Sequence, residues 1–324
     1  MKKIRVGIVG YGNVGRGVIK AVDAASDMEL AALFTRRDPK TLDIADSGIP
    51  ICNLNDAEKM KDEIDVLALC GGSATDLAEQ GPRFAASFNV VDSFDTHARI
   101  PEYMAEVNAA AKNTTAIISS GWDPGLFSMM RLMFETFLPD GISYTFWGKG
   151  ISQGHSDAVR HVEGVKDGVQ YTIPVKSAIE SVRRGERPVL DARQKHTRQC
   201  YVVAEPGADE AALEEKIKTM PHYFADYNTT VTFVKEDDLK ANHSKMPHGG
   251  TVLHSGRTGE NEHVMEFLLK LDSNPEFTGS VVAAYARAAV RLAAERCYGA
   301  KTVFDVPLAY LSEKSRAVLV KELL

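Results

Sequence analysis

Three glycines near the start of the chain have the spacing G-x-G-x-x-G. They stand between a strand-like apolar run, 4–9, and an amphipathic run that begins at Asn13. In that context Gly10 permits a tight turn, Gly12 lets the backbone approach a pyrophosphate, and Gly15 lets helix and strand pack closely. The N–H groups of the helix start favour the same anion. We therefore predict dinucleotide binding, the alternative being a glycine-rich turn without a ligand. The predicted contacts here are Gly10, Tyr11, Gly12, Asn13 and Val14.

Two adjacent guanidinium groups follow the second predicted strand. The run 30–35 ends at Thr35, and Arg36 and Arg37 come next. This position faces the adenosine ribose, where an acidic residue holds the 2′-hydroxyl of NAD and arginine accommodates the 2′-phosphate of NADP. Two arginine forks and a hydroxyl suit a dianionic phosphate. The sequence therefore favours NADP, unless both arginines are solvated loop charges.

Further polar loops follow the strand-like runs 65–70, 89–92 and 115–119. Ligands of a doubly wound sheet bind outside the carboxyl ends of its strands, so these loops form one predicted surface. Two carboxylates, Asp92 and Asp123, belong to it. The other residues that we assign to the cofactor are Gly71, Gly72, Ser73, Ala74, Thr75, Ser93, Ser120, Gly121, Trp122 and Pro124.

The elements that must position these residues indicate two domains. Strands alternate with helices up to about Gly125, which is typical of α/β folds with a parallel sheet. We expect a Rossmann-type doubly wound domain over 1–122, with the tail, about 300–324, packed back on it. Strand-like runs with intervening helices then predict a second, α+β domain over 123–299. It would bind the substrate, carry an open mixed sheet and include a long alanine-rich helix, 280–298.

The composition is that of a water-soluble globular protein, with 324 residues, 44% hydrophobic and 25% charged. The net charge of −6 and the absence of a long basic block argue against nucleic-acid binding, and no apolar run is long enough to span a membrane. The four cysteines have no zinc-like spacing, so we expect no metal site. A core strand begins within four residues of the start, which predicts a cytoplasmic protein without a secretory peptide.

Several segments, spread over nearly the whole chain, resemble the meso-diaminopimelate dehydrogenase family. The most specific are S-Q-G-H-S-D-A at 152–158 and M-P-H-G-G at 246–250. The resemblance implies a homodimeric, NADP-dependent enzyme that oxidatively deaminates the D-centre of meso-2,6-diaminopimelate to L-2-amino-6-oxopimelate and ammonia. The other segments that carry it are G-Y-G-N-V-G-R at 10–16, F-T-R-R at 34–37, S-S-G-W-D-P-G at 119–125, F-W-G at 146–148, R-Q-C at 198–200 and L-K-L-D-S-N-P at 269–275.

The resemblance also assigns the substrate end of the site. Arg198, Thr172 and His248 would hold the carboxylate of the L-centre, and Asn274 would contact its amino group. An arginine fork is suited to a carboxylate. Trp147 would form a pocket wall, and a loop with Gln153, Gly154 and Asp157 would cross the pocket.

Asp92 and Asp123 are the candidate catalytic carboxylates. Both follow strands of the first domain, where the nicotinamide is expected. There they would hold the substrate ammonium, favour the developing iminium and act as general base. The sequence does not choose between them. Their alternatives are structural, namely a helix cap for Asp92 and an Asx turn before Pro124 for Asp123.

Two other functions compete with this interpretation. One is another two-domain dehydrogenase of amino-acid metabolism, of the homoserine or dihydrodipicolinate type. The other is a non-catalytic NADP-binding sensor, which would bind the nucleotide without turnover. Neither accounts for the segments 152–158 and 246–250.

Overall fold

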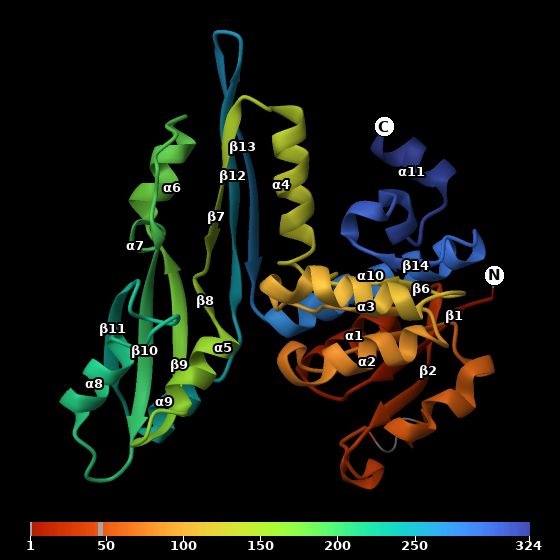
Figure 1. Ribbon diagram of the computed structural model, residues 1–324, viewed down its shortest axis with the longest axis horizontal. Helices are drawn as coiled ribbons and strands as arrows, with labels where there is room; N and C mark the ends of the chain where they lie inside the picture. The colour runs from red at the N-terminus through yellow and green to blue at the C-terminus, as the bar shows by residue number, and fades with distance from the viewer. Residues whose placement is uncertain (1, 45–47) are drawn as a thin grey trace. The chain divides into compact units, whose positions relative to one another are not determined.

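The computed structural model describes residues 2–44 and 48–324, and the chain divides into two compact units. Unit 1 comprises residues 1–129 and 275–324, and unit 2 comprises residues 130–274. Figure 1 shows the elements of both. Unit 1 is therefore assembled from both ends of the sequence.

Unit 1 is built on a seven-stranded, wholly parallel sheet in the order β14-β6-β5-β4-β1-β2-β3. The strand order reverses between β1 and β4, and this is the switch point at which doubly wound sheets bind ligands. The prediction of a Rossmann-type sheet is confirmed. The strands are β1 (Ile4–Val9), β2 (Met28–Thr35), β3 (Ile51–Asn53), β4 (Val66–Leu69), β5 (Val90–Asp92), β6 (Thr115–Ile117) and β14 (Gly299–Lys301).

Helices cover both faces of this sheet (Figure 1). Because strand side chains alternate between faces, Val6 and Ile8 contribute to one apolar core and Val9 to the other. The first core contains residues of α1 (Asn13–Ala24) and α10 (Asn274–Ala294). The second contains residues of α2 (Ala78–Ala85), α3 (Ile100–Ala110) and the 3-10 segment η3 (Leu54–Glu63). The remaining short helical segments of unit 1 are η1 (Pro39–Thr41), η4 (Ser73–Leu77), η5 (His97–Arg99), η6 (Val303–Asp305), η7 (Leu308–Leu311) and α11 (Arg316–Leu323).

The long helix α10 lies in unit 1, whereas the sequence placed it in the second domain. Val282 and Tyr285 share a core with Val6 of β1. The backbones of α10 and α1 approach so closely that a Cβ on Gly279 would lie 2.3 Å from the carbonyl carbon of Gly17. The alanine-rich face that predicted a buried helix is thus satisfied by the Rossmann sheet.

The end of the chain is held to unit 1 by arginines of α10. Arg287 donates to both carboxylate oxygens of Asp27, at 2.7 and 2.8 Å. Arg291 donates to the carbonyl oxygens of Ala309, Tyr310 and Ser312. These contacts hold the segment that follows β14.

Unit 2 contains two sheets, one with the order β11-β10-β9-β8 and one with the order β13-β12-β7. The first is mixed, because β10 pairs antiparallel with β9 and parallel with β11. The sequence predicted a single open mixed sheet and missed the long β12–β13 hairpin. The strands are β7 (Gly141–Trp147), β8 (Gly150–Ile151), β9 (Val165–Pro174), β10 (His196–Ala204), β11 (Asn228–Phe233), β12 (His248–Thr258) and β13 (Asn261–Leu271). The helices are α4 (Leu126–Phe137, which begins in unit 1), α5 (Gln153–Arg160), α6 (Lys176–Arg183), α7 (Ala192–Lys195), α8 (Glu210–Lys218) and α9 (Glu236–His243).

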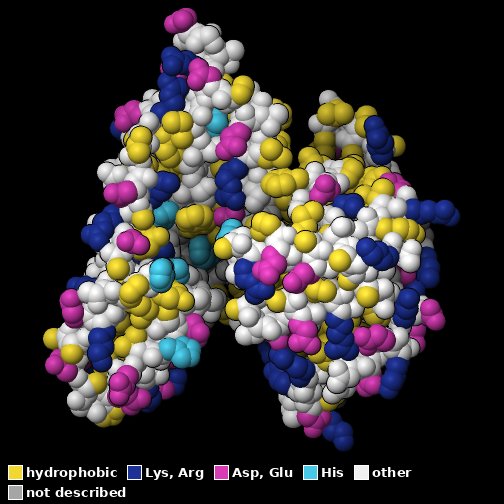
Figure 2. Space-filling model, in the orientation of Figure 1, with side chains coloured by type: hydrophobic (Ala, Val, Ile, Leu, Met, Phe, Trp, Pro, Cys, Tyr) yellow, Lys and Arg dark blue, Asp and Glu magenta, His cyan; other side chains and the backbone are white. Residues whose placement is uncertain are grey.

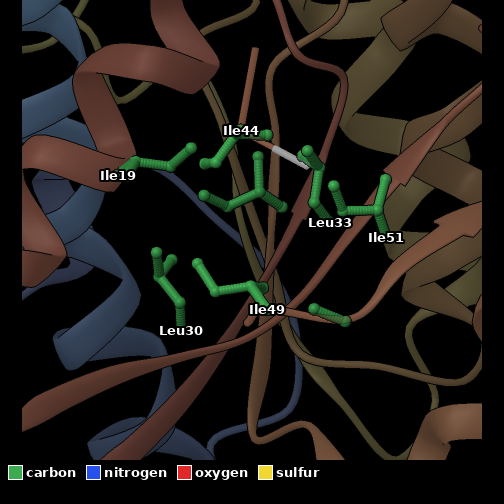
Figure 3. A pocket seen from close by; sticks show the side chains of 8 residues that line it. Ile19, Leu30, Leu33, Ile44, Ile49 and Ile51 are labelled. Atoms are coloured by element: carbon green, nitrogen blue, oxygen red, sulfur yellow. The ribbon is translucent and has the colours of Figure 1, made fainter. Parts of the chain in front are cut away.

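An apolar gap lies beside β2 in unit 1, where Ile19, Leu30, Leu33, Ile44 and Ile51 point toward one another (Figure 3). Only hydrophobic side chains line it, so it offers a ligand no hydrogen bond and belongs to the core. On the face drawn in Figure 2, basic and acidic side chains are interspersed over the surface.

Candidate active site

The glycine turn of unit 1 has the geometry that its spacing predicts. Gly10 has φ of +96°, which favours glycine. A Cβ on Gly15 would lie 2.2 Å from the carbonyl oxygen of Gly10, so helix α1 packs directly on the turn. A Cβ on Gly12 would meet no protein atom within 4 Å. Helix α1 begins there without a side-chain cap. The turn thus offers open space and an uncapped helix start, as a pyrophosphate requires.

Arg37 and Tyr11 are held together at the end of β2. Arg37 donates to the carbonyl oxygen of Tyr11, and its backbone N–H donates to Thr35 Oγ1 at 3.1 Å. The Tyr11 hydroxyl donates to Asp43 at 2.7 Å, and Asp43 pairs with Arg16 at 3.2 Å. The guanidinium groups of Arg16 and Arg37 both lie over the Tyr11 ring. Positive charge therefore gathers beside the glycine turn.

Arg36 forms an ion pair that the sequence analysis did not foresee. Its Nη2 lies 2.7 Å from the carboxylate of Asp76, and its side chain is 71% exposed. Asp76 belongs to η4 and also accepts from the backbone N–H of Gly72 at 3.1 Å and from Thr75 Oγ1 at 3.3 Å. The predicted phosphate-binding arginine is thus tied to the predicted cofactor loop of β4.

Asp92 does not have the environment of a catalytic carboxylate. It is 0% exposed, and its carboxylate accepts from the backbone N–H groups of Phe94 and Ser119, both at 2.9 Å, and from the Tyr103 hydroxyl at 2.7 Å. Burial raises the pKa of the Asp92 carboxyl, against the effect of these hydrogen bonds. The structure therefore corrects the prediction that Asp92 meets the substrate: the side chain holds the loops after β5 and β6 together.

The exposed carboxylate of the same loop is Asp95, which the sequence analysis missed. Its backbone N–H donates to Ser73 Oγ at 3.0 Å, so its position is tied to the cofactor loop 71–75. Its side chain lies at the surface. The two carboxylates of the segment V-D-S-F-D could have been distinguished by the buried strand: Asp92 is the last residue of β5, and Asp95 lies beyond it.

The loop 119–125 is folded on itself after β6. A Cβ on Gly125, which has φ of +127°, would lie 1.8 Å from the carbonyl oxygen of Gly121. Ser120 donates to the Asp92 carbonyl oxygen through both its backbone N–H and its hydroxyl. Trp122 is buried and packs edge-on against Phe127. Asp123 is half-buried at this turn, so it keeps the exposure that a ligand contact needs.

In unit 2 the structure brings Arg198 and Thr172 together. They are direct partners in the antiparallel pairing of β10 with β9, and Arg198 Nη1 donates to Thr172 Oγ1. Gln170 Nε2 donates to the same oxygen at 3.5 Å. Because both lone pairs of the Thr172 oxygen are then used, its hydroxyl hydrogen is left as a donor. The sequence placed Arg198 just before the strand, and it lies within β10.

Arg198 is a buried cation without an acidic partner. It is 7% exposed, and its Nε has no hydrogen-bond partner. No ion pair joins it to any carboxylate in residues 2–44 or 48–324. Burial lowers the pKa of its guanidinium group, and Tyr227 raises it. A buried charge of this kind is costly unless an anion compensates it.

His248 opens β12 beside the same strands. It lies against Gly150, which pairs with Thr172 in the first sheet. His248 Nδ1 lies 2.8 Å from the backbone nitrogen and 3.1 Å from the carbonyl oxygen of Gly249, so this ring nitrogen is engaged with the backbone. The three residues assigned to the far carboxylate thus come from β9, β10 and β12.

Trp147 ends β7 and is 38% exposed. Its backbone N–H donates to His196 Nε2 at 2.8 Å, and the two rings stack with centroids 5.3 Å apart. Burial, with the positive charges of Arg198 and Lys195, lowers the pKa of His196 to about 4. A neutral His196 therefore holds the tryptophan that we predicted as a pocket wall.

For the remaining predicted site residues, the structure gives positions that do not by themselves indicate a shared site. Gln153, Gly154 and Asp157 lie on helix α5 rather than on a loop, and all three are exposed. Asp157 pairs with Arg160 at 3.3 Å. Asn274 opens α10, and its backbone N–H donates to the Met246 carbonyl oxygen at 2.8 Å. Their roles stay predictions.

No group of three or more His, Cys, Asp or Glu side chains within residues 2–44 and 48–324 has the arrangement of a metal site. Over the same part of the chain, none of the helices combines the length and apolar character needed to cross a bilayer.

Comparisons with protein families, with curated proteins and with solved structures all match this chain to the same kind of enzyme. The diaminopimelic acid dehydrogenase C-terminal domain matches residues 121–273. A meso-diaminopimelate D-dehydrogenase of Ureibacillus thermosphaericus is 60% identical over 327 residues, covering 100% of both chains. A crystal structure of a mutant meso-diaminopimelate dehydrogenase of Clostridium tetani E88 with DAP is 53% identical, with a TM-score of 0.95 over 99% of this chain and 100% of that one. An engineered D-amino acid dehydrogenase bound to NADP+ is 42% identical, with a TM-score of 0.88 over 100% of both chains.

A relative that matches from end to end, together with solved structures of the same fold at more than 40% identity, decides the classification. The chain belongs to the meso-diaminopimelate dehydrogenase family.

Proposed function

We propose that this protein is an NADP-dependent amino-acid dehydrogenase acting on meso-2,6-diaminopimelate. It removes the amino group from the D-centre, giving L-2-amino-6-oxopimelate and ammonia, and it also runs in the reverse direction. Its relatives carry the name of this activity. Solved relatives were crystallised with DAP and with NADP+.

The observation that carries the proposal is the buried, unpaired Arg198. A substrate with a second carboxylate, remote from the reacting carbon, would supply the anion that the described residues do not. We propose that Arg198, the Thr172 hydroxyl and His248 Nε2 bind this carboxylate at the L-centre. Charge-assisted hydrogen bonds of this kind contribute about 1.5–3 kcal/mol each. They therefore select a double-headed amino acid over a short one.

The amine of the D-centre needs acceptors that are open to a ligand. We assign Asp95 and Asp123 to it, because Asp95 is exposed and Asp123 is half-buried whereas Asp92 is fully committed to the fold. These carboxylates would accept hydrogen bonds from the ammonium and favour the cationic iminium that forms before water adds. Either one would also serve as the base that takes the amine proton.

The cofactor fits the loops of unit 1. The open space beside Gly12 and the uncapped start of α1 suit the pyrophosphate, and Arg36, Arg37 and Thr35 suit the 2′-phosphate. We assign the nicotinamide end to Ser93 and to Gly121, Trp122 and Pro124. The site would hold NADP+, and the bound nucleotide would supply the hydride acceptor for the oxidation at the D-carbon.

We further propose a cytoplasmic homodimer. Unit 2 exposes large apolar side chains on α4, β7 and β13, which would be covered by a second copy of the chain. The four cysteines are free, as is usual in a reducing compartment. The exposed residues concerned are Leu132, Phe137, Ile142, Val264 and Leu268.

Steady-state absorbance of the reduced nicotinamide tests the proposed reaction. The purified protein should turn over NADP+ with the meso isomer of diaminopimelate and not with the L,L isomer, which has no D-centre. In Arg198→Met the KM for the meso isomer should rise about tenfold or more, while the Kd for NADP+ stays unchanged. Binding of NADP+ without turnover would instead support a sensor, and equal losses of both affinities would contradict the assignment of Arg198.

A further inference from the structure

The ring of Tyr227 lies against the guanidinium group of Arg198. The distance from Arg198 Cζ to the ring centroid is 3.9 Å. Tyr227 immediately precedes β11, and β11 pairs with β10 so that Thr229 is the register partner of Arg198. The ring is therefore supplied by the strand next to the arginine, and Phe224 and Tyr227 are joined by a backbone hydrogen bond of 2.9 Å that closes the turn before β11.

An aromatic face compensates a buried charge in a way that a carboxylate does not. A carboxylate beside Arg198 would neutralise it but would also occupy the N–H groups that a ligand needs. The π face of tyrosine attracts the cation and leaves the N–H groups at the edge of the guanidinium plane. The two neighbours of Arg198 therefore have different effects: Thr172 takes one N–H, and Tyr227 covers a face.

We propose that Tyr227 is a positioning residue for the anion site: its ring holds the Arg198 guanidinium in the orientation that binds the far carboxylate of the substrate. The proposal rests on the proposed function of Arg198. Tyr227 need not touch the substrate, and it takes no part in the proton or hydride transfer.

The test compares variants that keep or remove the aromatic face. Tyr227→Phe keeps it, and its KM for meso-diaminopimelate should stay within about twofold of wild type. Tyr227→Leu removes it, and the KM should rise about fivefold to thirtyfold, with kcat and the Kd for NADP+ nearly unchanged. A tyrosine that served only to stabilise the fold would not produce this separation of KM from kcat.

Tyr201→Leu is the matched control. Tyr201 stacks on His243, with centroids 4.0 Å apart, and as an odd-numbered residue of β10 it lies on the face of the strand opposite to Arg198. Its replacement removes a ring of the same size from the same strand pair, so the KM should not change. If Tyr227→Leu fails to fold by circular dichroism, Tyr227→Met fills the space without a π face and carries the same expectation.

The double variant Arg198→Met with Tyr227→Leu identifies the route of the effect. If Tyr227 acts through Arg198, its substitution should add nothing further to the KM in the Arg198→Met background. An unchanged KM in Tyr227→Leu, or an equal loss in Tyr227→Phe, overturns the role of Tyr227 while Arg198→Met remains impaired. If wild type does not turn over meso-diaminopimelate, or Arg198→Met leaves its KM unchanged, the proposed function fails instead.

Discussion

Two carboxylates three residues apart, Asp92 and Asp95, differ in their surroundings, and this difference predicts opposite effects of substitution. Asp95→Asn should lower kcat/KM for meso-diaminopimelate by tenfold or more, since an exposed acceptor of the substrate ammonium loses its charge, and the free energy of unfolding should stay unchanged (~0–0.5 kcal/mol). Asp92→Asn should reduce the free energy of unfolding by about 1–3 kcal/mol, because its carboxylate accepts three buried hydrogen bonds.

Kinetics and urea unfolding of the two variants check this prediction. Asp123→Asn serves as a further comparison, because it alters the other carboxylate assigned to the amine. A catalytic loss confined to Asp92→Asn in a normally stable protein would return the role to Asp92.

If Arg36 binds the 2′-phosphate as proposed, Asp76 should compete with the cofactor for it. The carboxylate of Asp76 lies 2.7 Å from the guanidinium group of Arg36. The proposed site for the 2′-phosphate uses the same guanidinium group. Asp76→Asn keeps an oxygen for the Gly72 N–H and removes the charge. Since an exposed pair contributes only about 0–1 kcal/mol, the affinity for 2′,5′-ADP should rise by up to about fivefold. Calorimetric titration measures it.

The same substitution in an Arg36→Ala background is the control for Asp76. It should leave the affinity for 2′,5′-ADP unchanged, because the pair no longer exists. A weaker affinity in the single variant Asp76→Asn would show that the carboxylate supports the site rather than competing for Arg36.

At the scale of elements, two glycines at the start of α1 should have different roles: Gly15 in folding and Gly12 in binding the cofactor. Gly15→Ala should destabilise the fold by about 1–3 kcal/mol, because its Cβ would overlap the Gly10 carbonyl oxygen at 2.2 Å. Gly12→Ala should leave the free energy of unfolding nearly unchanged, since its Cβ enters open space. It should nevertheless weaken NADP+ binding about tenfold or more by occupying the place of the pyrophosphate.

Thermal unfolding with and without NADP+ measures both effects of these glycine substitutions. The expected pattern is a lower midpoint for Gly15→Ala alone and a lost NADP+ shift for Gly12→Ala. A stable Gly12→Ala protein that still binds NADP+ tightly would remove the pyrophosphate from this turn.

His196 connects the two sheets of unit 2, because it lies on β10 and accepts from Trp147 of β7. Its pKa is about 4 in the folded protein, against 6.5 for a free imidazole. As the pH falls, the unfolded chain binds this proton first. The contribution of neutral His196 to the free energy of unfolding should therefore be complete above about pH 6.5. It should be lost as the pH falls toward 4.

Urea unfolding at a series of pH values checks the role of His196. His196→Gln should flatten the decline below about pH 6.5, while a control substitution at the exposed His222 should not. An unaltered slope in His196→Gln would assign the acid sensitivity of unit 2 to other groups.

A local sequence pattern predicts a helix or strand only where neighbouring residues alone determine that element. The apolar run and the glycines after it predicted the first strand with the bounds 4–9, and predicted that a turn and a helix follow it, because each feature is set by neighbours in sequence. The β12–β13 hairpin was missed although Met265, Phe267, Leu269 and Leu271 alternate along β13. The partner strand β12 has three glycines and only two large apolar side chains, so its own pattern does not indicate a strand. Helix α5 was taken for a loop because Gly154 lies in its first turn. Arg198 was found through its motif, whereas its partner Tyr227 depends on the β10–β11 pairing, which no local pattern shows.

At the scale of the molecule, the exposed apolar side chains of unit 2 predict the oligomeric state. Leu268 is 63% exposed on β13. Leu268→Lys should weaken the homodimer, lowering the mass measured by sedimentation at micromolar concentration, because a charge would be buried at the proposed interface. Val320 of α11, a helix of unit 1, is also exposed, at 50%. Val320→Lys should leave the mass unchanged, and a monomeric wild type would refute the proposal.

The discontinuous construction of unit 1 has a consequence for biosynthesis. The N-terminal end of the chain leaves the ribosome first, so β1 to β6 emerge long before α10 and β14. Helix α10 completes the core around Val6 and Ile8, and β14 completes the sheet. Unit 2 is continuous and finishes emerging first. Unit 2 can therefore fold while translation continues, whereas unit 1 must await the final segment. A nascent chain stalled before Pro275 would leave a hydrophobic sheet face available to chaperones.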